Sequence, residues 1–336
     1  MNGSRPLGNL LVTGGCGFIG SAFIRCLLRS KFSGRIINLD ALTYAANPKN
    51  LDGFHDHPRY RLIQGDINDG PLVDKLCLDY EIDAIVHFAA ETHVDRSIAS
   101  AYPFWEVNVK GTLTLLEIVR RYPHIHFHHV STDEVYGSLG ESGMFTEHSN
   151  YRPNSPYAAS KAASDHFVRA YAHTYSLLTT ISHCSNNYGP GQHFEKFIPH
   201  MIANCLAQKP LPIYGNGRNV RDWIYVDDHV EAIVAILERG VRGETYDIGG
   251  DCEWANIDLL QQLMEALARE QDQPLETYQK LIRFVPDRPG HDFRYAIDST
   301  KIKKQLGWQP RTTFEEGLLK TIRYYTATHR LSEYRR

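Results

Sequence analysis

Near the amino terminus the sequence reads Leu10-Leu11-Val12-Thr13-Gly14-Gly15-Cys16-Gly17-Phe18-Ile19-Gly20, an apolar run followed by a glycine-rich turn. The apolar run predicts a buried strand, and the glycines predict a tight turn into a helix that packs closely on that strand. Glycines let the backbone approach a pyrophosphate, and the free N–H groups at the start of the helix favour phosphate oxygens. Asp40 ends the next predicted strand, about 20 residues on, where a carboxylate accepts ribose hydroxyls and repels a 2′-phosphate. We therefore expect a dinucleotide site that prefers NAD to NADP, with a ligand-free glycine-rich turn as the alternative.

The segments that follow this turn alternate between short β-rich runs and stretches with helical spacing. Continuous apolar runs suit strands that are buried on both faces, as in a parallel sheet. Right-handed helical crossovers then make a doubly wound sheet the simplest topology. Strands are expected at 10–12, 35–39, 60–63, 83–88, 125–131 and 178–182, and helices at 103–122 and 156–175. The predicted fold class is α/β, a Rossmann-like doubly wound parallel sheet with a smaller mixed α/β substrate-binding domain.

The spacing of prolines and glycines changes after Gly189-Pro190, which predicts loops and shorter elements. Thr245-Tyr246-Asp247-Ile248 looks like a further strand of the first sheet, so the domain boundary is not sharp. Helices are expected at 228–238, 257–268 and 314–325. We expect residues 1–188 to form an NAD-binding Rossmann domain with a return near 226–250, and residues 189–336 to form mainly the substrate-binding domain.

Composition argues against several function classes. The 336 residues include 36 Lys+Arg and 39 Asp+Glu, a formal net charge of −3, so no basic excess favours nucleic acid. The polar start through Asn9 and the break in the first apolar run at Thr13 argue against a secretory signal or a membrane span. The six cysteines form no CxxC pair, which fits reduced thiols. We expect a cytoplasmic protein without nucleic-acid or membrane partners.

Tyr157 and Lys161 stand at i and i+4 of the helix predicted at 156–175, so they share one face of it. A free tyrosine has a pKa near 10 and is a poor base at neutral pH. A lysine ammonium and an oxidised nicotinamide nearby would both stabilise the phenolate and suit it to proton transfer. This spacing also occurs by chance on exposed helices, but its place after a glycine-rich Rossmann half favours the catalytic interpretation.

With these residues the chain resembles the extended short-chain dehydrogenase/reductases, and Ser131-Thr132-Asp133-Glu134-Val135-Tyr136-Gly137 narrows the resemblance to the nucleotide-sugar 4,6-dehydratases. The resemblance covers about residues 9–325. Further matching stretches are Ala89-Ala90-Glu91-Thr92-His93-Val94-Asp95-Arg96-Ser97, Ser185-Asn186-Asn187-Tyr188-Gly189-Pro190, Arg221-Asp222-Trp223-Ile224-Tyr225-Val226 and Asp287-Arg288-Pro289-Gly290-His291-Asp292. The chain departs from the usual pattern at Gly191-Gln192-His193-Phe194, Trp254-Ala255 and Phe293, which leaves the choice between dTDP and UDP open.

The resemblance implies a lyase that dehydrates dTDP-glucose to dTDP-4-keto-6-deoxyglucose for deoxysugar biosynthesis, with rhamnose the commonest product in the family. Tyr157 would take the proton while NAD+ oxidises C4, and Thr132 would hold the C4 oxygen. Glu134 would then remove the C5 proton, Asp133 would protonate the departing C6 hydroxyl, and hydride would return to C6. The acid and the base need opposite protonation states, so their environments must separate their pKa values. A strand-end turn or helix cap is the alternative for residues 132–134.

The same resemblance implies two sets of binding residues. The cofactor set is Gly14, Gly17, Phe18, Ile19, Gly20, Asp40, Ala41, Leu42, Thr43, Asp66, Ile67, Phe88, Ala89, Ala90, Glu91, Thr92, Val107, Tyr157, Lys161 and Asn187. The substrate set is Thr92, Thr132, Asn186, Lys196, Phe197, Pro212, Ile213, Tyr214, Arg221, Asn256, Asp287, Arg288, Pro289, Gly290 and His291. Arg221 suits a diphosphate because a guanidinium is a planar fork of donors, and a surface ion pair with Asp222 is the alternative.

Three other functions stay open on the sequence. A UDP-glucose 4,6-dehydratase would share the Asp133-Glu134 pair. A nucleotide-sugar epimerase or decarboxylase would use Tyr157 and Lys161 without that pair. A non-catalytic NAD-binding sensor is the alternative from another class, and such proteins commonly lack the tyrosine or the lysine.

Two further expectations concern metal and assembly. His124, His126 and His128 would share one face of a strand and could bind a divalent ion, but a polar strand face is the simpler account and no metal is expected. The resemblance also implies a homodimer in which the helices at 103–122 and 156–175 pair across the interface.

Overall fold

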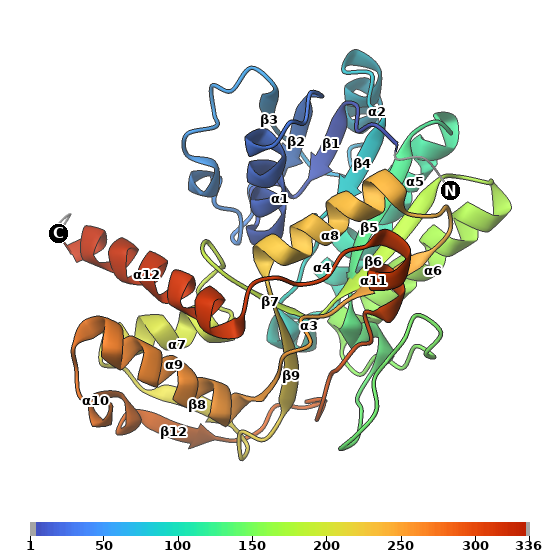
Figure 1. The fold of residues 1–336 in the computed structure, drawn as a ribbon. Coiled ribbons are helices and arrows are strands. Elements are labelled where there is room, and N and C mark those ends of the chain that lie inside the picture. The colour runs from blue at the N-terminus through green and yellow to red at the C-terminus, as the bar shows by residue number, and fades with distance from the viewer. Residues whose placement is uncertain (1–4, 334–336) are drawn as a thin grey trace.

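The computed structural model describes residues 5–333, and a seven-stranded sheet lies at its centre (Figure 1). The strand order is β10-β6-β5-β4-β1-β2-β3, and every neighbouring pair is parallel. The strands are β1 (Leu10–Thr13), β2 (Ile36–Asp40), β3 (Tyr60–Gln64), β4 (Ala84–His87), β5 (His126–Thr132), β6 (Thr179–Cys184) and β10 (Thr245–Ile248). Apart from the edge strand β3, every residue of these strands is buried, as expected for a sheet covered on both faces. The predicted doubly wound α/β fold is confirmed.

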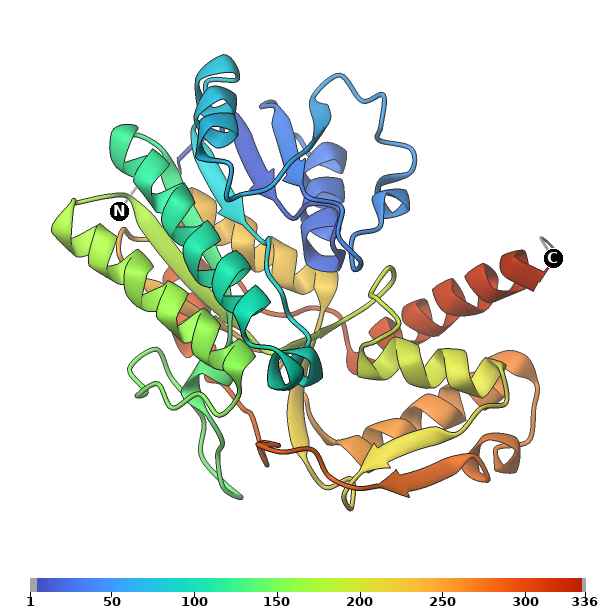
Figure 2. The same cartoon turned by 180° about the vertical axis from the view of Figure 1, so that it is seen from behind.

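Helices cover the two faces of the sheet (Figures 1 and 2). On one face, apolar side chains of the sheet pack against α1 (Phe18–Arg29) and α8 (Val226–Arg239). On the other face they pack against α2 (Gly70–Asp79), α5 (Thr112–Arg121) and α6 (Pro156–Thr174). The chain order reverses between β1 and β4, and a crevice opens at the carboxyl ends of the strands at such a switch point.

A second, smaller group of elements lies below the sheet in Figure 1 and has its own apolar core. Two small sheets, β11-β9-β7 and β12-β8, pack there with four helices, α7, α9, α10 and α12. The elements are β7 (Asn186–Tyr188), α7 (Phe197–Leu206), β8 (Leu211–Tyr214), β9 (Val220–Tyr225), β11 (Glu253–Ala255), α9 (Asn256–Gln271), α10 (Glu276–Gln279), β12 (Ile282–Val285) and α12 (Phe314–Glu333). Across residues 5–333, no helix is long and apolar enough to cross a membrane.

The single helix expected at 103–122 is interrupted in the structure. It consists of α4 (Tyr102–Phe104), a π-helical stretch η2 (Trp105–Gly111) and then α5. The carbonyl oxygen of Asn108 accepts the hydroxyls of Thr112, at 2.6 Å, and Ser164, at 2.7 Å. These two hydroxyls give the Asn108 carbonyl oxygen hydrogen-bond donors from side chains. π-helical stretches within helices are frequent near functional sites. The remaining short elements are η1 (Pro48–Leu51), α3 (Val94–Ala99), η3 (Asp133–Tyr136) and α11 (Thr300–Leu306).

Candidate active site

The glycine-rich turn between β1 and α1 leaves no room for side chains at two of its positions. Gly14 has a φ of +70°, and a Cβ there would lie 2.6 Å from the backbone nitrogen of Ala89. A Cβ on Gly20 would lie 2.5 Å from the carbonyl oxygen of Gly14. At Gly17 a Cβ would meet one atom, that same carbonyl oxygen, at 3.2 Å. The start of α1 therefore faces open space, and the turn fits a pyrophosphate held by backbone N–H groups.

Two backbone N–H groups position Asp40 at the end of β2. Its Oδ2 accepts from Cys16 N and its Oδ1 accepts from Leu42 N, both at 2.8 Å. On the same strand, Asn38 Oδ1 accepts from Gly15 N at 3.0 Å and ties the turn to β2. The carboxylate is thus fixed beside the glycine-rich turn, where the ribose of a dinucleotide would lie.

A cavity of about 340 Å³ runs along the carboxyl ends of the central strands. It brings together most of the predicted cofactor residues and all of the predicted catalytic residues. The predicted residues on its wall are Gly14, Gly17, Phe18, Ile19, Gly20, Asp40, Ala41, Thr43, Asp66, Ile67, Phe88, Ala89, Ala90, Glu91, Thr92, Val107, Thr132, Asp133, Glu134, Tyr157, Lys161, Asn186, Asn187 and Lys196. Among the predicted cofactor residues Leu42 is off the wall, where its N–H serves Asp40.

Tyr157 and Lys161 extend from α6 to the end of β5 and are almost fully buried, at 7% and 3% exposure. Lys161 Nζ donates to the carbonyl oxygen of Val130 at 2.9 Å. Burial lowers the pKa of Lys161 to about 8. Burial and the charge of Glu134 raise the pKa of Tyr157 well above its usual value, while a hydrogen bond with Thr132 opposes the rise. The phenol therefore needs additional positive charge to act as a base near neutral pH, and an oxidised nicotinamide carries such a charge.

Asp133 and Glu134 open η3 directly after β5, where Thr132 Oγ1 accepts from Glu134 N at 3.3 Å. Burial, and then the neighbouring Glu134, raise the pKa of Asp133 well above its usual value. Burial also raises the pKa of Glu134, but the cations Arg288 and Lys196 oppose that rise. Asp133 is therefore the carboxyl favoured to keep its proton, and Glu134 is the one favoured to lose it. These are the states that the predicted acid and base require.

Three cations face Glu134 from different elements: Lys196, Arg221 and Arg288. Lys196 Nζ donates to Thr92 O at 3.0 Å. Arg221 is 5% exposed, and its guanidinium donates to the carbonyl oxygen of Asp292 at 3.0 Å. The surface ion pair considered for Arg221 is not formed, because its side chain turns inward. These three side chains place positive charge close to Glu134, and cations of this kind would suit a diphosphate.

The other predicted substrate residues do not line the cavity. They are Phe197, Pro212, Ile213, Tyr214, Arg221, Asn256, Asp287, Arg288, Pro289, Gly290 and His291. Ile213 is 1% exposed and, with Phe197 against it, belongs to the core of the second group of elements. His291 Nδ1 lies 2.6 Å from Asp287 Oδ1, and its ring makes an edge contact with Tyr214.

Several wall residues were not predicted from the sequence, among them Cys184, Ser185, Gln192, His193 and Glu195. Cys184 and Ser185 directly precede Asn186, at the carboxyl end of β6. That position is the signal that could have identified them, because the carboxyl ends of parallel strands meet at one edge of the sheet.

Two of the three histidines of β5 make contacts with hydroxyl groups. His126 Nε2 and His128 Nδ1 each lie 2.9 Å from Thr180 Oγ1. In the described part of the chain, residues 5–333, no group of three or more His, Cys, Asp or Glu side chains is arranged to hold a metal ion.

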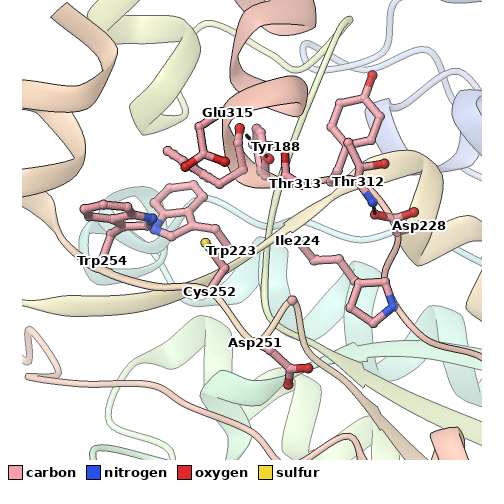
Figure 3. A pocket seen from close by; sticks show the side chains of 14 residues that line it. Tyr188, Trp223, Ile224, Asp228, Asp251, Cys252, Trp254, Thr312, Thr313 and Glu315 are labelled. Carbon is pink, nitrogen blue, oxygen red and sulfur yellow. Dashed lines mark hydrogen bonds between the residues drawn. The ribbon is translucent and has the colours of Figure 1, made fainter. Parts of the chain in front are cut away.

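A separate cavity of about 270 Å³ lies between β9, β11 and the start of α12 (Figure 3). Aromatic side chains form much of its wall, including Tyr188, Trp223 and Trp254. None of the predicted site residues lines it. The dinucleotide-type cavity is therefore the candidate active site.

A glycine-rich turn, a strand-end aspartate and a buried Tyr157–Lys161 pair in one cavity define a short-chain dehydrogenase/reductase of the extended class. The family model described as GDP-mannose 4,6 dehydratase matches residues 11–321. The chain belongs to this 4,6-dehydratase family.

Individual relatives agree with this assignment. The dTDP-glucose 4,6-dehydratase of Neisseria gonorrhoeae is 49% identical over 330 residues, which cover 94% of this chain and 95% of that protein. The solved structure of the dTDP-glucose 4,6-dehydratase DesIV from Streptomyces venezuelae, with NAD bound, has a TM-score of 0.91 and 47% identity, covering 96% of this chain and 98% of that one. A UDP-glucose 4-epimerase from Thermotoga maritima shares the fold, with a TM-score of 0.86, 28% identity and coverage of 96% and 99%.

Proposed function

We propose that this chain catalyses the NAD-dependent dehydration of dTDP-glucose to dTDP-4-keto-6-deoxyglucose. The observation that carries the proposal is the presence of Asp133 and Glu134 in the same cavity as Tyr157 and Lys161. A tyrosine–lysine pair serves a redox step at a hydroxyl, and an added acid and base allow an elimination. The high identity to dTDP-glucose 4,6-dehydratases supports the same reaction and the same nucleotide.

NAD would be held at the glycine-rich turn by backbone N–H groups, with Asp40 on its ribose. Bound there, it supplies a hydride acceptor for C4 and later a hydride donor for C6. In the first step the Tyr157 phenolate, which the Lys161 ammonium stabilises, takes the proton of the C4 hydroxyl and becomes a phenol. Thr132, which already hydrogen-bonds the phenol, is placed to hold the C4 oxygen.

The elimination uses the two carboxyl groups. The C4 ketone acidifies the C5 hydrogen, and Glu134 removes it as a proton. Asp133, which keeps its proton because burial and Glu134 raise its pKa, protonates the C6 hydroxyl so that it leaves as water. Lys196, Arg221 and Arg288 would hold the diphosphate, because charge-assisted hydrogen bonds from cations to phosphate are short and strong.

An epimerase is the nearest alternative reaction on this fold. It would use Tyr157 and Lys161, but it has no step that needs a carboxyl group held protonated beside an ionised one. The pKa of Asp133 is raised by burial and by Glu134, whereas nearby cations oppose the rise at Glu134, and this difference favours the dehydratase.

The test is incubation of the purified protein with dTDP-glucose and, separately, with UDP-glucose, followed by mass spectrometry of the products. Loss of one water from dTDP-glucose without net NADH formation is the expected result. Faster loss of water from UDP-glucose would reassign the nucleotide, and unchanged mass with both sugars would contradict the proposed reaction.

We also propose that the enzyme is a cytoplasmic homodimer. Helices α5 and α6 lie side by side on one face of the molecule (Figure 2). Tyr102 and Trp105, whose rings lie 5.5 Å apart, are 66% and 48% exposed, and Phe167 on α6 is 37% exposed. Exposed apolar side chains of this kind are common at interfaces. All six cysteines are free thiols, as suits a reducing compartment. Light scattering at micromolar concentration is expected to give twice the chain mass of 38.3 kDa, and a monomer mass would contradict the dimer.

A further inference from the structure

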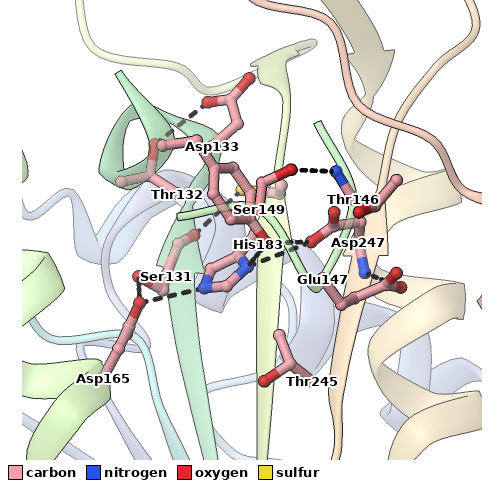
Figure 4. A network of polar contacts seen from close by, with 12 residues as sticks. Ser131, Thr132, Asp133, Thr146, Glu147, Ser149, Asp165, His183, Thr245 and Asp247 are labelled. Carbon is pink, nitrogen blue, oxygen red and sulfur yellow. Dashed lines mark hydrogen bonds and ion pairs between the residues drawn. The ribbon is translucent and has the colours of Figure 1, made fainter. Parts of the chain in front are cut away.

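Three ionisable side chains that do not line the cavity form a buried row, which begins one turn of α6 beyond Lys161 (Figure 4). His183 on β6 lies between the carboxylates of Asp165 on α6 and Asp247 on β10. Its Nε2 is 3.0 Å from Asp165 Oδ2, and its Nδ1 is 3.1 Å from Asp247 Oδ1. All three side chains have no solvent exposure. None of them has a part in the steps described above.

The contacts within this Asp165–His183–Asp247 triad favour the ionised forms of Asp165 and His183. Burial opposes a charge on His183, but its hydrogen bonds to Asp165 and Asp247 raise its pKa to about 9. Asp165 Oδ2 also accepts from Ser131 Oγ at 3.0 Å and from the Tyr151 hydroxyl at 2.8 Å. Burial opposes ionisation of Asp165 too, yet the hydrogen bonds and charges of His129 and His183 hold its pKa below the usual value. The triad therefore places a carboxylate, Asp165, directly beside a protonated imidazole, His183.

One imidazole connects this triad to the lysine of the active site. His129 Nε2 lies 3.3 Å from Asp165 Oδ1 and 3.4 Å from Lys161 Nζ. The carboxylate and the ammonium are therefore less than about 7 Å apart, and they stand at i and i+4 on α6. Burial and the Lys161 ammonium keep the pKa of His129 low, at about 4, so this imidazole is neutral.

Asp165 is the anion that opposes the Lys161 charge. The ionisable groups around Lys161 in the described structure are Tyr157 and Asp165 on α6, His129 on β5, His87 on β4 and Cys184 on β6. Burial keeps both imidazoles neutral and keeps the phenol and the thiol protonated, the thiol with a pKa of about 12. A buried ammonium is costly without a compensating anion. Of these groups, Asp165 is the one that supplies such an anion.

We propose that Asp165, held as an anion by its contact with His183, is a positioning residue that keeps Lys161 protonated and so keeps Tyr157 able to ionise during C4 oxidation. This inference rests on the proposed dehydratase function. It extends the site from the cavity wall to a buried cluster of ionisable side chains on α6, β5, β6 and β10.

The test is the pH dependence of kcat in Asp165→Asn. Asparagine keeps the size of the side chain and removes its charge, so Lys161 should lose its proton at lower pH. At a separation below about 7 Å, the alkaline limb of kcat is expected to move down by about 1–2 pH units. The KM for dTDP-glucose is expected to change little, because Asp165 is not on the cavity wall.

Tyr151→Phe is the matched control. It removes a hydroxyl that contacts both Asp165 and His183, at 2.8 Å each, without changing any charge. It is expected to lower thermal stability and to leave the alkaline limb in place. An alkaline limb that stays at the wild-type pH in Asp165→Asn, or that moves equally in both variants, would overturn the proposal.

A measurement on the wild-type enzyme covers the case in which Asp165→Asn does not fold. In ¹⁵N-histidine NMR of the holoenzyme, one imidazolium is expected to persist above pH 8, and His183→Gln should remove its signal. Neutral signals for all imidazoles at pH 8 would overturn the proposal. Failure of the proposed function is distinguishable, since the wild-type enzyme would then not dehydrate dTDP-glucose at any pH.

Discussion

Replacing Glu134 by glutamine should separate the two halves of the reaction. Glutamine matches the size of the side chain but cannot accept the C5 proton. The charge of Glu134 also contributes to the raised pKa of Tyr157, so its removal should make the phenol easier to ionise. We therefore expect C4 oxidation to continue in Glu134→Gln while C5 deprotonation and water loss stop.

The size of the effect follows from the site. General acid–base catalysis by a positioned group contributes about 10²–10⁴-fold, which corresponds to roughly 3–5 kcal/mol of barrier. Lys196, Arg221 and Arg288 oppose the rise in the pKa of Glu134 and so keep it available as a base. The neighbouring carboxyl group on the wall, Asp133, is a poor substitute base, because burial and Glu134 raise its pKa well above the usual value. We expect kcat for dehydration to fall by at least about 100-fold.

The assay follows the substrate in deuterated buffer by NMR and the bound cofactor by absorbance. Glu134→Gln should accumulate reduced cofactor and show no deuterium at C5. Asp133→Asn is the control, because it should still exchange the C5 hydrogen while failing to release water. Deuterium entering C5 at the wild-type rate in Glu134→Gln would refute the assignment of the base.

Three further predictions follow from other parts of the site. Asp40→Ala should weaken NAD binding and reduce the preference for NAD over NADP. An unchanged ratio of the dissociation constants for NAD and NADP would refute the assignment of Asp40 to the ribose. Gly14→Ala should lower the free energy of unfolding by about 2–4 kcal/mol in urea denaturation, because a left-handed residue costs about 1–2 kcal/mol and its Cβ would also meet Ala89 N at 2.6 Å. Gly53→Ala is the control, because Gly53 has a φ of +87° and a Cβ there would have no atom within 4 Å, so only the conformational cost applies. An equal loss of unfolding free energy in both variants would show that the contact with Ala89 N adds nothing. Burial lowers the pKa of Lys161 to about 8, so kcat should be highest below that pH and fall above it as the ammonium is lost, whereas a flat profile to about pH 9.5 would contradict its role.

Local features of the sequence were sufficient to predict the sheet and the dinucleotide end of the site. The apolar runs of β1, β2 and β4 are buried on both faces, and the glycines of the first turn stand where side chains would collide. The spacing of Tyr157 and Lys161 placed both on one face of α6, and the structure shows them together in the cavity.

Features that depend on contacts between distant segments could not be predicted in this way. In the π-helical stretch η2, the carbonyl oxygen of Asn108 accepts from Ser164, which comes from another helix. Asp165, His183 and Asp247 come from three elements and meet only when the sheet is assembled. Nothing in the local pattern around any one of them indicates a buried charge.

The most direct test of the account follows the hydrogen on C4. When dTDP-glucose carrying deuterium at C4 is converted by the wild-type enzyme, the product should contain that deuterium in its C6 methyl group. This result requires oxidation at C4, elimination and hydride return to C6 within one cavity. A product without deuterium at C6, or a sugar that retains it at C4, would contradict the proposed reaction.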